Sequence, residues 1–343
     1  MKLAVVGHSL IHPRQQAFFR EVASQGHDVV LFCPQVWGPL RTFGDSWLGD
    51  SRLYENGSFA LRPLPVIGAP DMYEYNLLGL VPVIMLAEPD IVYVQQEVHS
   101  YIADLVIGAS SLENTKKAIF VWENLREPSP YERRLLDSCD KVICGNDAAL
   151  RLHAPNPRET GKYTILPQVG VDTDHFQARP GVQRDVSVGF VGRPVAEKGY
   201  DKLLLAWPLA KVTPWTDWAK LPWIYSTARV VPCLSQDTPA WREQAMPYVA
   251  VEALSSGCFV VASNAGAIPF WLFGGYTEDK IGAPGVYEVA QDAPPSKVRE
   301  AIALALLDAE KGPNDQGRSW VIRNLSNPVI ARRLVEEFAS LVD

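Results

Sequence analysis

Short apolar runs rich in β-branched residues alternate with helix-like segments along this chain, and the alternation occurs twice. In the first half, such runs occupy residues 3–6, 29–32, 91–94, 118–121 and 141–144, with helical patterns at 14–25, 100–110 and 131–138. The alternation restarts with runs at 186–191, 228–234 and 259–262, and helical patterns at 200–207, 249–256 and 296–308. Strands without a polar face are buried on both sides in parallel sheets. The pattern predicts an α/β chain with two doubly wound parallel sheets.

The length also favours two domains. The 343 residues exceed the ~250 at which a single hydrophobic core stops growing. Residues 168–184 contain glycine and proline in a weakly patterned stretch that is typical of a domain junction. We predict an N-terminal domain at 1–167, a C-terminal domain at 168–324 and a helix at 325–343 that returns to the N-terminal domain. Such sheets bind ligands beyond the carboxyl ends of their strands, so we expect the site in a cleft between the domains.

Composition narrows the class of function. With 32 Lys plus Arg against 39 Asp plus Glu, the net charge of -7 offers no basic field for nucleic acid. The five cysteines are widely spread, so neither a disulfide framework nor a zinc site is expected. A strand-like run follows the first two residues directly and is too short for a signal peptide. The longest apolar run, 77–87, is too short to span a bilayer. We expect a cytoplasmic protein that could also work at the inner face of the membrane.

One segment combines glycine with two cations. The run at 186–191 leads to Gly192, and Arg193 and Lys198 follow in a loop that enters the helix predicted at 200–207. Glycine permits close approach of a ligand to the backbone, Arg offers a planar fork of donors, and a helix N-terminus favours an anion. The arrangement therefore favours a diphosphate. The alternative is an ordinary strand–turn–helix connection with solvated charges.

A carboxylate lies inside an apolar helical run. Glu252 belongs to the segment at 249–256, where an unpaired charge would be costly. It should therefore have a polar partner, such as the hydroxyl groups of a sugar. The alternative is that Glu252 caps the helix or pairs within it.

Four motifs in chain order resemble those of the retaining glycosyltransferases of family 4, which have the GT-B fold and use nucleotide-sugar donors. They are residues 170–176 (GVDTDHF), Gly192-Arg193 with Glu197-Lys198-Gly199, the pair Glu243 and Glu252, and Gly266-Ala267-Ile268-Pro269. The similarity extends over most of the chain and is densest from 170 to 269. Each motif alone is weak, whereas four in the right order make a strong case. The resemblance implies two Rossmann-like domains that face a central cleft.

The resemblance also implies roles for residues of the C-terminal domain. Arg193 and Lys198 would bind the donor diphosphate and stabilise it as the leaving group. Glu252 would accept hydrogen bonds from the ribose, and Glu243 would contact the donor sugar. Further donor-binding residues would lie at Gly192, Gln244, Ala245 and Met246. The donor would be UDP- or GDP-linked, the acceptor a glycan or a lipid-linked molecule, and neither a metal nor another cofactor would be needed.

The sequence departs from the family in the spacing of its two glutamates. The family has seven residues between them, whereas eight separate Glu243 from Glu252, so that Gln244 occupies the strictly spaced position. Either a one-residue bulge keeps Glu243 in place, or Gln244 substitutes as a neutral hydrogen-bonding residue.

A second departure concerns the N-terminal domain. The family usually has a histidine after the strand at 118–121, where this chain has Glu123 and Asn124. Either of these would have to serve instead, with Glu97 and His99 in the preceding loop as other candidates. Further acceptor-side candidates are His8 and His12, near the start of the chain. We expect His27, His153 and His175 to be structural.

The third departure is length. Only 45 positions separate Lys198 from Glu243, which is shorter than the family norm by roughly one βα unit of ~30 residues. We expect the missing piece to include a central strand and a loop near the nucleobase. The tryptophans that crowd this region are expected to serve packing rather than to form a sugar platform; they stand at positions 207, 215, 218, 223 and 241.

Two further hypotheses compete with a transferase. One is a degenerate relative that binds a nucleotide-sugar or a partner without turnover, and the other is a nucleotide-sugar epimerase. A peripheral membrane contact is a further hypothesis, because one loop segment contains Trp37, Arg41, Phe43 and Trp47. The alternative for that segment is an acceptor pocket or ordinary loop packing.

Overall fold

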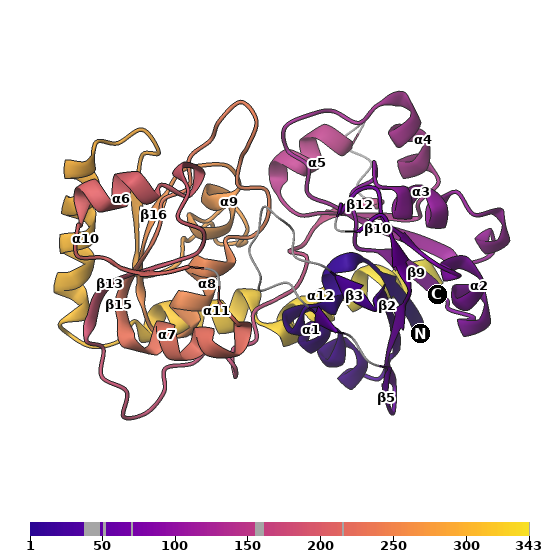
Figure 1. Ribbon diagram of the computed structural model, residues 1–343, viewed down its shortest axis with the longest axis horizontal. Helices are drawn as coiled ribbons and strands as arrows, with labels where there is room; N and C mark the ends of the chain where they lie inside the picture. Colours follow the sequence, from indigo (N-terminus) through magenta and orange to yellow (C-terminus); the bar gives the residue numbers. More distant parts are fainter. Residues whose placement is uncertain (38–48, 51–52, 70, 155–160, 215, 343) are drawn as a thin grey trace. The chain divides into compact units, whose positions relative to one another are not determined.

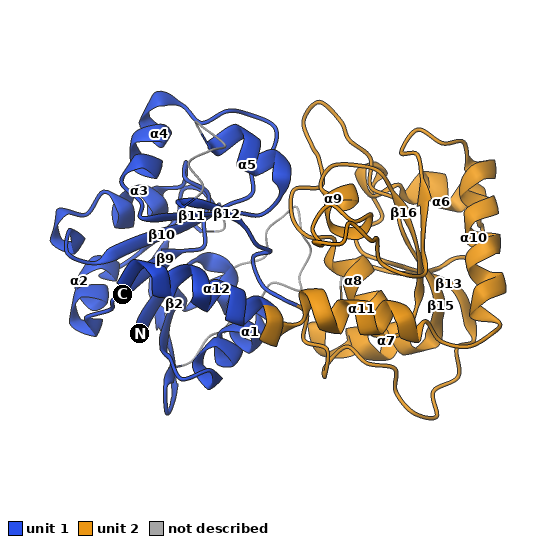
Figure 2. Cartoon of the chain, turned by 180° about the vertical axis from the view of Figure 1, so that it is seen from behind, with its two compact units in different colours: residues 1–170, 330–343 blue, residues 171–329 orange. Residues whose placement is uncertain are grey.

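The computed structural model describes residues 1–37, 49–50, 53–69, 71–154, 161–214 and 216–342. The chain divides into two compact units, which Figure 2 distinguishes by colour. Unit 1 comprises Met1–Gly170 and Ile330–Asp343, and unit 2 comprises Val171–Val329. Unit 2 is therefore inserted in the chain between two segments of unit 1.

Unit 1 is built on an eight-stranded sheet of order β12-β11-β10-β9-β1-β2-β6-β5 (Figure 1). All neighbouring strands are parallel except the β5–β6 pair. The strands are β1 (Lys2–Val6), β2 (Asp28–Pro34), β5 (Tyr54–Asn56), β6 (Phe59–Leu64), β9 (Ile91–Val94), β10 (Lys116–Val121), β11 (Lys141–Cys144) and β12 (Tyr163–Ile165). Two small antiparallel pairs accompany the sheet, β3 (Val36–Trp37) with β4 (Gly49–Asp50) and β7 (Val66–Ile67) with β8 (Asn76–Leu77).

Four α-helices of unit 1 begin at residues whose side chains cap them. His12, Ser100 and Asn146 each accept a hydrogen bond from an amide of the helix that follows, and Ser129 forms a capping box with Glu132. The elements are η1 (His8–Ile11), α1 (Pro13–Ser24), α2 (Leu80–Ala87), α3 (Tyr101–Ile107), η3 (Ser110–Leu112), α4 (Pro130–Asp137), α5 (Asp147–His153) and α12 (Asn327–Val342).

The strand order of unit 1 reverses beside β1. The chain runs from β1 to β2 and β6 on one side, and then continues from β9 to β10, β11 and β12 on the other. The position between β1 and β9 is therefore a topological switch point, where loops diverge from the carboxyl edge of a parallel sheet. Val6, the last residue of β1, pairs in register with Val94, the last residue of β9.

Helix α12 completes unit 1 from the far end of the chain. Phe338 is fully buried and its ring meets Tyr93 of β9 edge-on, with centroids 5.1 Å apart. Glu337 Oε2 lies 2.5 Å from Lys141 Nζ, and the Lys141 side chain is only 4% exposed. A lysine buried to this extent needs an anionic partner, so α12 is integral to the core of unit 1.

Unit 2 has a five-stranded parallel sheet of order β14-β13-β15-β16-β17. Its strands are β13 (Val186–Val191), β14 (Lys211–Thr213), β15 (Ala228–Cys233), β16 (Phe259–Ser263) and β17 (Val286–Val289). The strand order reverses beside β13, so a second switch point lies between β13 and β15. β13 pairs directly with β15 and β14 lies at the edge, so the described sheet is continuous at its centre, and the expected loss of a central strand stays a prediction.

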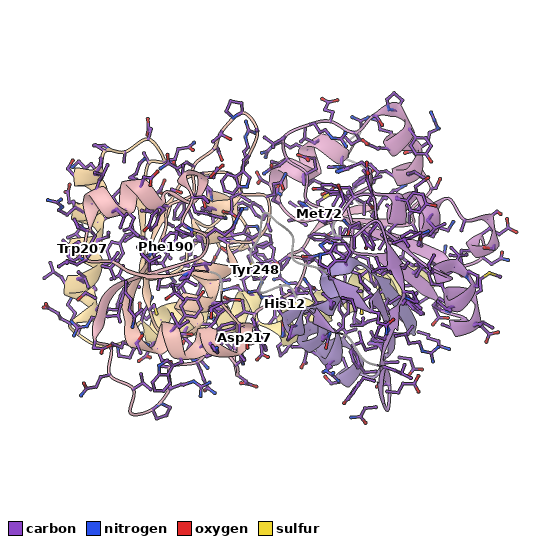
Figure 3. The ribbon with its side chains drawn as sticks, in the orientation of Figure 1. His12, Met72, Phe190, Trp207, Asp217 and Tyr248 are labelled. Carbon is purple, nitrogen blue, oxygen red and sulfur yellow. The ribbon has the colours of Figure 1, made fainter. Side chains whose placement is uncertain are left out.

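Helices cover both faces of the second sheet, with α6 and α10 packed together on one face and α7, α8 and α11 on the other (Figure 1). The core between sheet and helices includes Leu203, Val230, Val261 and Ile302, and Phe190 lies in it as Figure 3 shows. Each such side chain contributes about 1.5–3 kcal/mol through burial. The elements are η4 (Ala196–Lys198), α6 (Tyr200–Ala206), η5 (Trp218–Lys220), α7 (Leu221–Thr227), α8 (Tyr248–Ser255), α9 (Ile268–Leu272), α10 (Pro295–Ala309) and α11 (Asp315–Leu325).

Candidate functional site

The loop after β13 depends on two glycines. Gly192 has φ +135°, which a residue with a side chain rarely adopts, and the space where its β-carbon would stand is open. Gly199 has φ +67°, and a β-carbon there would stand 2.7 Å from the β-carbon of Leu234, which directly follows β15. Gly199 therefore allows the loop that holds Arg193 and Lys198 to pack against the end of β15 at the switch point, and Gly192 permits the backbone conformation at the start of that loop.

Two of the predicted residues meet at this point. Lys198 Nζ lies 2.7 Å from Glu243 Oε2, with the two side chains 28% and 14% exposed. Ser235 Oγ donates a hydrogen bond of 2.6 Å to the same oxygen. The glutamate that contacts Lys198 is thus Glu243, while Gln244 lies half-buried beside it. Arg193 is also half-buried and directly follows Gly192.

The motif Gly266-Ala267 anchors the backbone of Glu243. The Ala267 amide donates to the Glu243 carbonyl at 2.9 Å. Gly266 has φ +49°, and a β-carbon there would stand 2.7 Å from the Glu243 nitrogen. The two motifs, twenty-odd residues apart in the sequence, are therefore one structural feature that sets the position of the Glu243 side chain.

Trp241 contributes an aromatic face to the same cluster. Lys198 Nζ lies 4.8 Å from the centre of its indole ring, within the range of a cation–π interaction. Two other tryptophans do serve packing: Trp218 stacks on His175 with centroids 3.6 Å apart, and Trp207 packs against the core of unit 2. Trp223 is 57% exposed, and Trp215 lies outside the described residues.

Glu252 is buried on α8, at 2% exposure, and accepts a hydrogen bond of 3.3 Å from the hydroxyl of Tyr225 on α7. Glu252 was expected to pair either with sugar hydroxyl groups or within its own helix. Its partner Tyr225 belongs instead to another helix. Tyr248, labelled in Figure 3, opens α8, and the loop before it contains Ala245 and Met246. Met246 directs its side chain into the core, at 2% exposure, so its main chain rather than its side chain is available to a ligand.

In unit 1 the switch point between β1 and β9 is closed by a hydrogen bond. His8 Nδ1 lies 2.7 Å from Gln96 Oε1. The imidazole packs against Trp37 and Tyr75, at centroid distances of 5.1 and 5.9 Å. Burial lowers the pKa of His8 to about 4, although the bond to Gln96 raises it. At neutral pH His8 is therefore an uncharged hydrogen-bonding group.

Trp37 is fully buried, so it offers no aromatic surface for a membrane contact. The other residues considered for that contact, Arg41, Phe43 and Trp47, lie outside the described residues. Across residues 1–342, apart from those that the structure leaves undescribed, no helix combines the length and the apolarity that a membrane span requires.

Glu97 is a buried carboxyl group in the loop after β9. Its Oε1 accepts hydrogen bonds from the amide of Trp122 and, at 2.7 Å, from that of Glu123. Its Oε2 is buried and makes no hydrogen bond within the described part of the chain. Burial raises the pKa of Glu97 to about 8, against the effect of the two amides. Glu97 therefore fastens the loop after β10 to the loop after β9, and it does so largely in its neutral form at pH 7.

The remaining acceptor-side candidates lie around this loop. Glu123 Oε1 accepts the amide of Leu125 at 2.6 Å, and Asn124 is buried. His99 packs against Tyr73 with centroids 4.5 Å apart, and burial, followed by the charge of Arg126, lowers the pKa of its imidazole.

Three other histidines make structural contacts. His12 Nδ1 accepts the amide of Arg14 at 3.1 Å and so caps α1, and burial lowers its pKa to about 3. His153 Nδ1 lies 2.9 Å from the Ala149 carbonyl, and His175 Nε2 lies 3.2 Å from the Trp218 carbonyl.

The described residues contain no group of three or more His, Cys, Asp or Glu side chains that could hold a metal ion. The cations at the unit 2 switch point are instead Lys198 and Arg193. Among the contributors that sequence reasoning missed, Ser235 and Gln96 each follow a buried strand within two residues, and that position was the signal that could have found them.

Two doubly wound units of this kind define the GT-B class of glycosyltransferase fold. No protein-family model and no curated protein sequence matches the chain. Among solved structures, sucrose-phosphate synthase from Thermosynechococcus elongatus is similar, with a TM-score of 0.64 and 15% identity over 99% of both chains. A glycosyltransferase from Rickettsia africae has a TM-score of 0.65 and 14% identity, over 100% of this chain and 98% of that one.

A third similar structure is the catalytic domain of starch synthase IV from Arabidopsis thaliana, solved with ADP and acarbose. Its TM-score is 0.63, with 11% identity over 99% of both chains. At these identities the comparisons concern the fold.

Proposed function

We propose that this protein is a retaining glycosyltransferase of family 4. It would transfer a sugar from a nucleotide-sugar donor to a hydroxyl group of a glycan, glycolipid or related acceptor, without a metal ion. The observation that carries the proposal is the cluster at the unit 2 switch point. There, Lys198 and Arg193 follow a strand and a glycine, and Lys198 contacts Glu243 at 2.7 Å.

In this reaction the bond between the anomeric carbon of the sugar and the diphosphate breaks, and the carbon forms a new bond to the acceptor oxygen on the same face. The acceptor proton passes to the departing phosphate oxygen. Lys198 and Arg193 stabilise the negative charge that develops on the diphosphate, which is the main electrostatic demand of the step. The two cations would supply the charge that a metal ion supplies elsewhere.

Glu243 and Glu252 are assigned to the donor. Glu243 would contact the hydroxyl groups of the sugar, and Glu252, oriented by Tyr225, would accept hydrogen bonds from the ribose. The donor is proposed to be UDP- or GDP-linked. In unit 1 the acceptor would meet groups at the carboxyl edge of the sheet, among which His8, Glu97 and Glu123 are the strongest candidates. We assign the protein to the cytoplasm, with the inner face of the membrane as the location for a lipid-linked acceptor.

A nucleotide panel tests the proposal. The thermal stability of the purified protein is measured with UDP, GDP, ADP, CMP and dTDP, each alone and with its common sugars attached. A ligand at 100 times its dissociation constant adds about 2.7 kcal/mol to the free energy of unfolding, which gives a visible shift. Stabilisation by one base family supports the donor site and selects the donor for an acceptor screen. Failure of every nucleotide to stabilise the protein would contradict the proposal.

A second candidate, a donor-binding protein without turnover, is favoured by the irregular glutamate spacing, with eight residues between Glu243 and Glu252 where the family has seven. The two candidates differ in whether the donor is consumed. Transfer of sugar to an acceptor supports the enzyme, binding without consumption supports the non-catalytic protein, and release of an epimerised donor would indicate an epimerase.

A further inference from the structure

We propose that Trp241 is a positioning residue of the donor site, whose indole face holds the Lys198 ammonium group while that group exchanges Glu243 for a phosphate oxygen. The identity of the anion rests on the proposed function. The arrangement of the four residues Lys198, Glu243, Ser235 and Trp241, here called the lysine clamp, rests on the described contacts alone.

The clamp holds Lys198 between two partners of different kind. The ammonium group lies 2.7 Å from Glu243 Oε2 and 4.8 Å from the centre of the Trp241 ring. An anion that binds Lys198 competes with the carboxylate for the same positive charge. It does not compete with the indole, because an aromatic face attracts a cation without neutralising it. Trp241 can therefore keep its contact with Lys198 in both states.

Glu243 is also held by a second partner. Ser235 Oγ donates to Glu243 Oε2 at 2.6 Å, and Ser235 is itself 1% exposed. When Lys198 turns to an anion, the carboxylate therefore retains a charge-assisted hydrogen bond. Each charged group of the pair therefore has a partner that it can give up and another that it keeps, which lowers the free-energy cost of the exchange.

A tight turn brings Trp241 to this place. The Thr238 amide donates to the Trp241 carbonyl at 2.8 Å, and Thr238 and Trp241 form an isolated antiparallel bridge. Two residues further on, Glu243 is fixed by the Ala267 amide. The indole and the carboxylate, two residues apart in the chain, thus both contact the Lys198 ammonium group.

The first test needs no ligand. The native protein is treated briefly with acetic anhydride, and the acetylation of Lys198 is measured by mass spectrometry relative to Lys311, whose side chain is 78% exposed. In Trp241→Leu, Lys198 should react about five- to thirtyfold faster than in the wild type, the range that corresponds to loss of a cation–π contact. Trp241→Phe keeps an aromatic face and should restore most of the protection.

The matched control is Trp223→Leu, the same chemical change at a tryptophan that is 57% exposed on α7. It should leave the reactivity of Lys198 unchanged. Equal reactivity of Lys198 in Trp241→Leu and the wild type would overturn the inference, whatever the ligand. If Trp241→Leu does not fold, the difference in fluorescence between wild type and Trp241→Phe replaces it. That difference should change when Lys198→Met is introduced in both backgrounds, and an unchanged difference would also overturn the inference.

The second test uses inorganic pyrophosphate and UDP as probes, with binding measured by calorimetry. Trp241→Leu should weaken the binding of both probes by about five- to thirtyfold, with partial recovery in Trp241→Phe. If the wild type binds both probes and Trp241→Leu binds them equally well, the positioning role is wrong while the proposed function stands. If the wild type binds pyrophosphate but no nucleotide, and Trp241→Leu weakens that binding, the proposed function fails while the lysine clamp stands as an anion site.

Discussion

The α-carbon of Gly266 lies directly against the main chain of Glu243, where a β-carbon would stand 2.7 Å from the Glu243 nitrogen. Gly266→Ala must therefore displace the segment that presents Glu243 to Lys198. We expect a loss of about 1–2 kcal/mol in the free energy of unfolding from the positive φ alone, with the clash added to it. Nucleotide-induced stabilisation should be lost as well.

Gly181→Ala is the matched control for that substitution. Gly181 has φ +77°, and nothing lies within 4 Å of the position that a β-carbon would take, so the variant introduces strain without a clash. It should lose stability but keep nucleotide binding. Denaturant unfolding and a thermal-shift assay with nucleotide measure the two effects separately. Equal retention of nucleotide binding in both variants would contradict the anchoring role of Gly266.

The two cations of the donor site should be needed for nucleotide binding and not for the fold. Arg193→Ala and Lys198→Met are each expected to weaken nucleotide binding at least tenfold, since a charge-assisted hydrogen bond contributes about 1.5–3 kcal/mol. Lys311→Met removes an exposed charge from the same unit and should change nothing. Calorimetric titration with the nucleotide that stabilises the wild type measures the loss. Wild-type nucleotide affinity in both variants would contradict the assignment of the diphosphate-binding site to this loop.

Substitution of Glu252 should affect the binding of the nucleoside and of the diphosphate to different extents. Glu252→Ala is expected to weaken the binding of a nucleoside more than that of pyrophosphate, because the carboxylate is assigned to the ribose. Tyr225→Phe removes the hydroxyl that donates to Glu252 and should produce a smaller loss of the same selectivity, with about 1–3 kcal/mol less stability. Equal losses for nucleoside and pyrophosphate would rule out the ribose assignment.

Glu97 should make the stability of unit 1 depend on pH. Its pKa is raised from 4.5 to about 8, so the folded protein keeps a proton that the unfolded chain releases. The contribution of this bound proton to the free energy of unfolding is complete below pH 4.5. It decreases as the pH rises toward 8, with a slope of about 1.4 kcal/mol per pH unit. The lowered pKa values of His8 and His12 act in the opposite sense, and only below pH 6.5.

Glu97→Gln isolates this effect because its amide oxygen can still accept both backbone hydrogen bonds. Between pH 6.5 and 8 the stability of the variant relative to the wild type should increase, and above that range the difference should level off. Glu310→Gln, at an exposed position, serves as the control and should show no such trend. Parallel stability curves for Glu97→Gln and the wild type would mean that Glu97 is ionised in the folded protein.

Substitution of Phe338 should show how much the packing of α12 contributes to the stability of unit 1. Phe338→Ala removes a fully buried ring from its contact with Tyr93 and is expected to cost about 3–5 kcal/mol. Leu307→Ala, at 57% exposure on α10, is a matched truncation that should cost far less. Denaturant unfolding measures both. A loss below about 1 kcal/mol for Phe338→Ala would show that α12 contributes little to unit 1.

The sequence pattern was most informative where strands are apolar throughout. The bounds predicted for β13, 186–191, are those observed, because a run buried on both faces has a sharp hydrophobic outline. No bounds were predicted for strand β6, because its sequence FALRPL includes Arg62 and Pro63 and it is only partly buried. β14 has three residues and β17 has four, too few to show a period. Short or half-exposed strands obtain their structure from their neighbours, which a local pattern does not reveal.

The candidate site likewise has features that the local sequence predicts and features that depend on tertiary packing. The motif around Gly192 and Lys198 was predicted because glycine and paired cations carry their chemistry locally. The contact of Trp241 with Lys198 was not, since it arises from a turn at Thr238 and from the packing of the β13 loop on the end of β15. In unit 1, Glu97 was named as a candidate to replace the family's histidine after the strand at 118–121, but its attachment to the amides of the next loop depends on strand order.

The insertion of unit 2 within unit 1 has a consequence for synthesis on the ribosome. Tyr93 and Lys141 are translated before unit 2, whereas Phe338 and Glu337, which cover and neutralise them, are translated after it. Unit 1 therefore begins to emerge from the ribosome before unit 2 but is completed after it. A nascent chain that has already folded unit 2 still exposes part of the unit 1 core, so chaperone binding to this protein should be concentrated on unit 1.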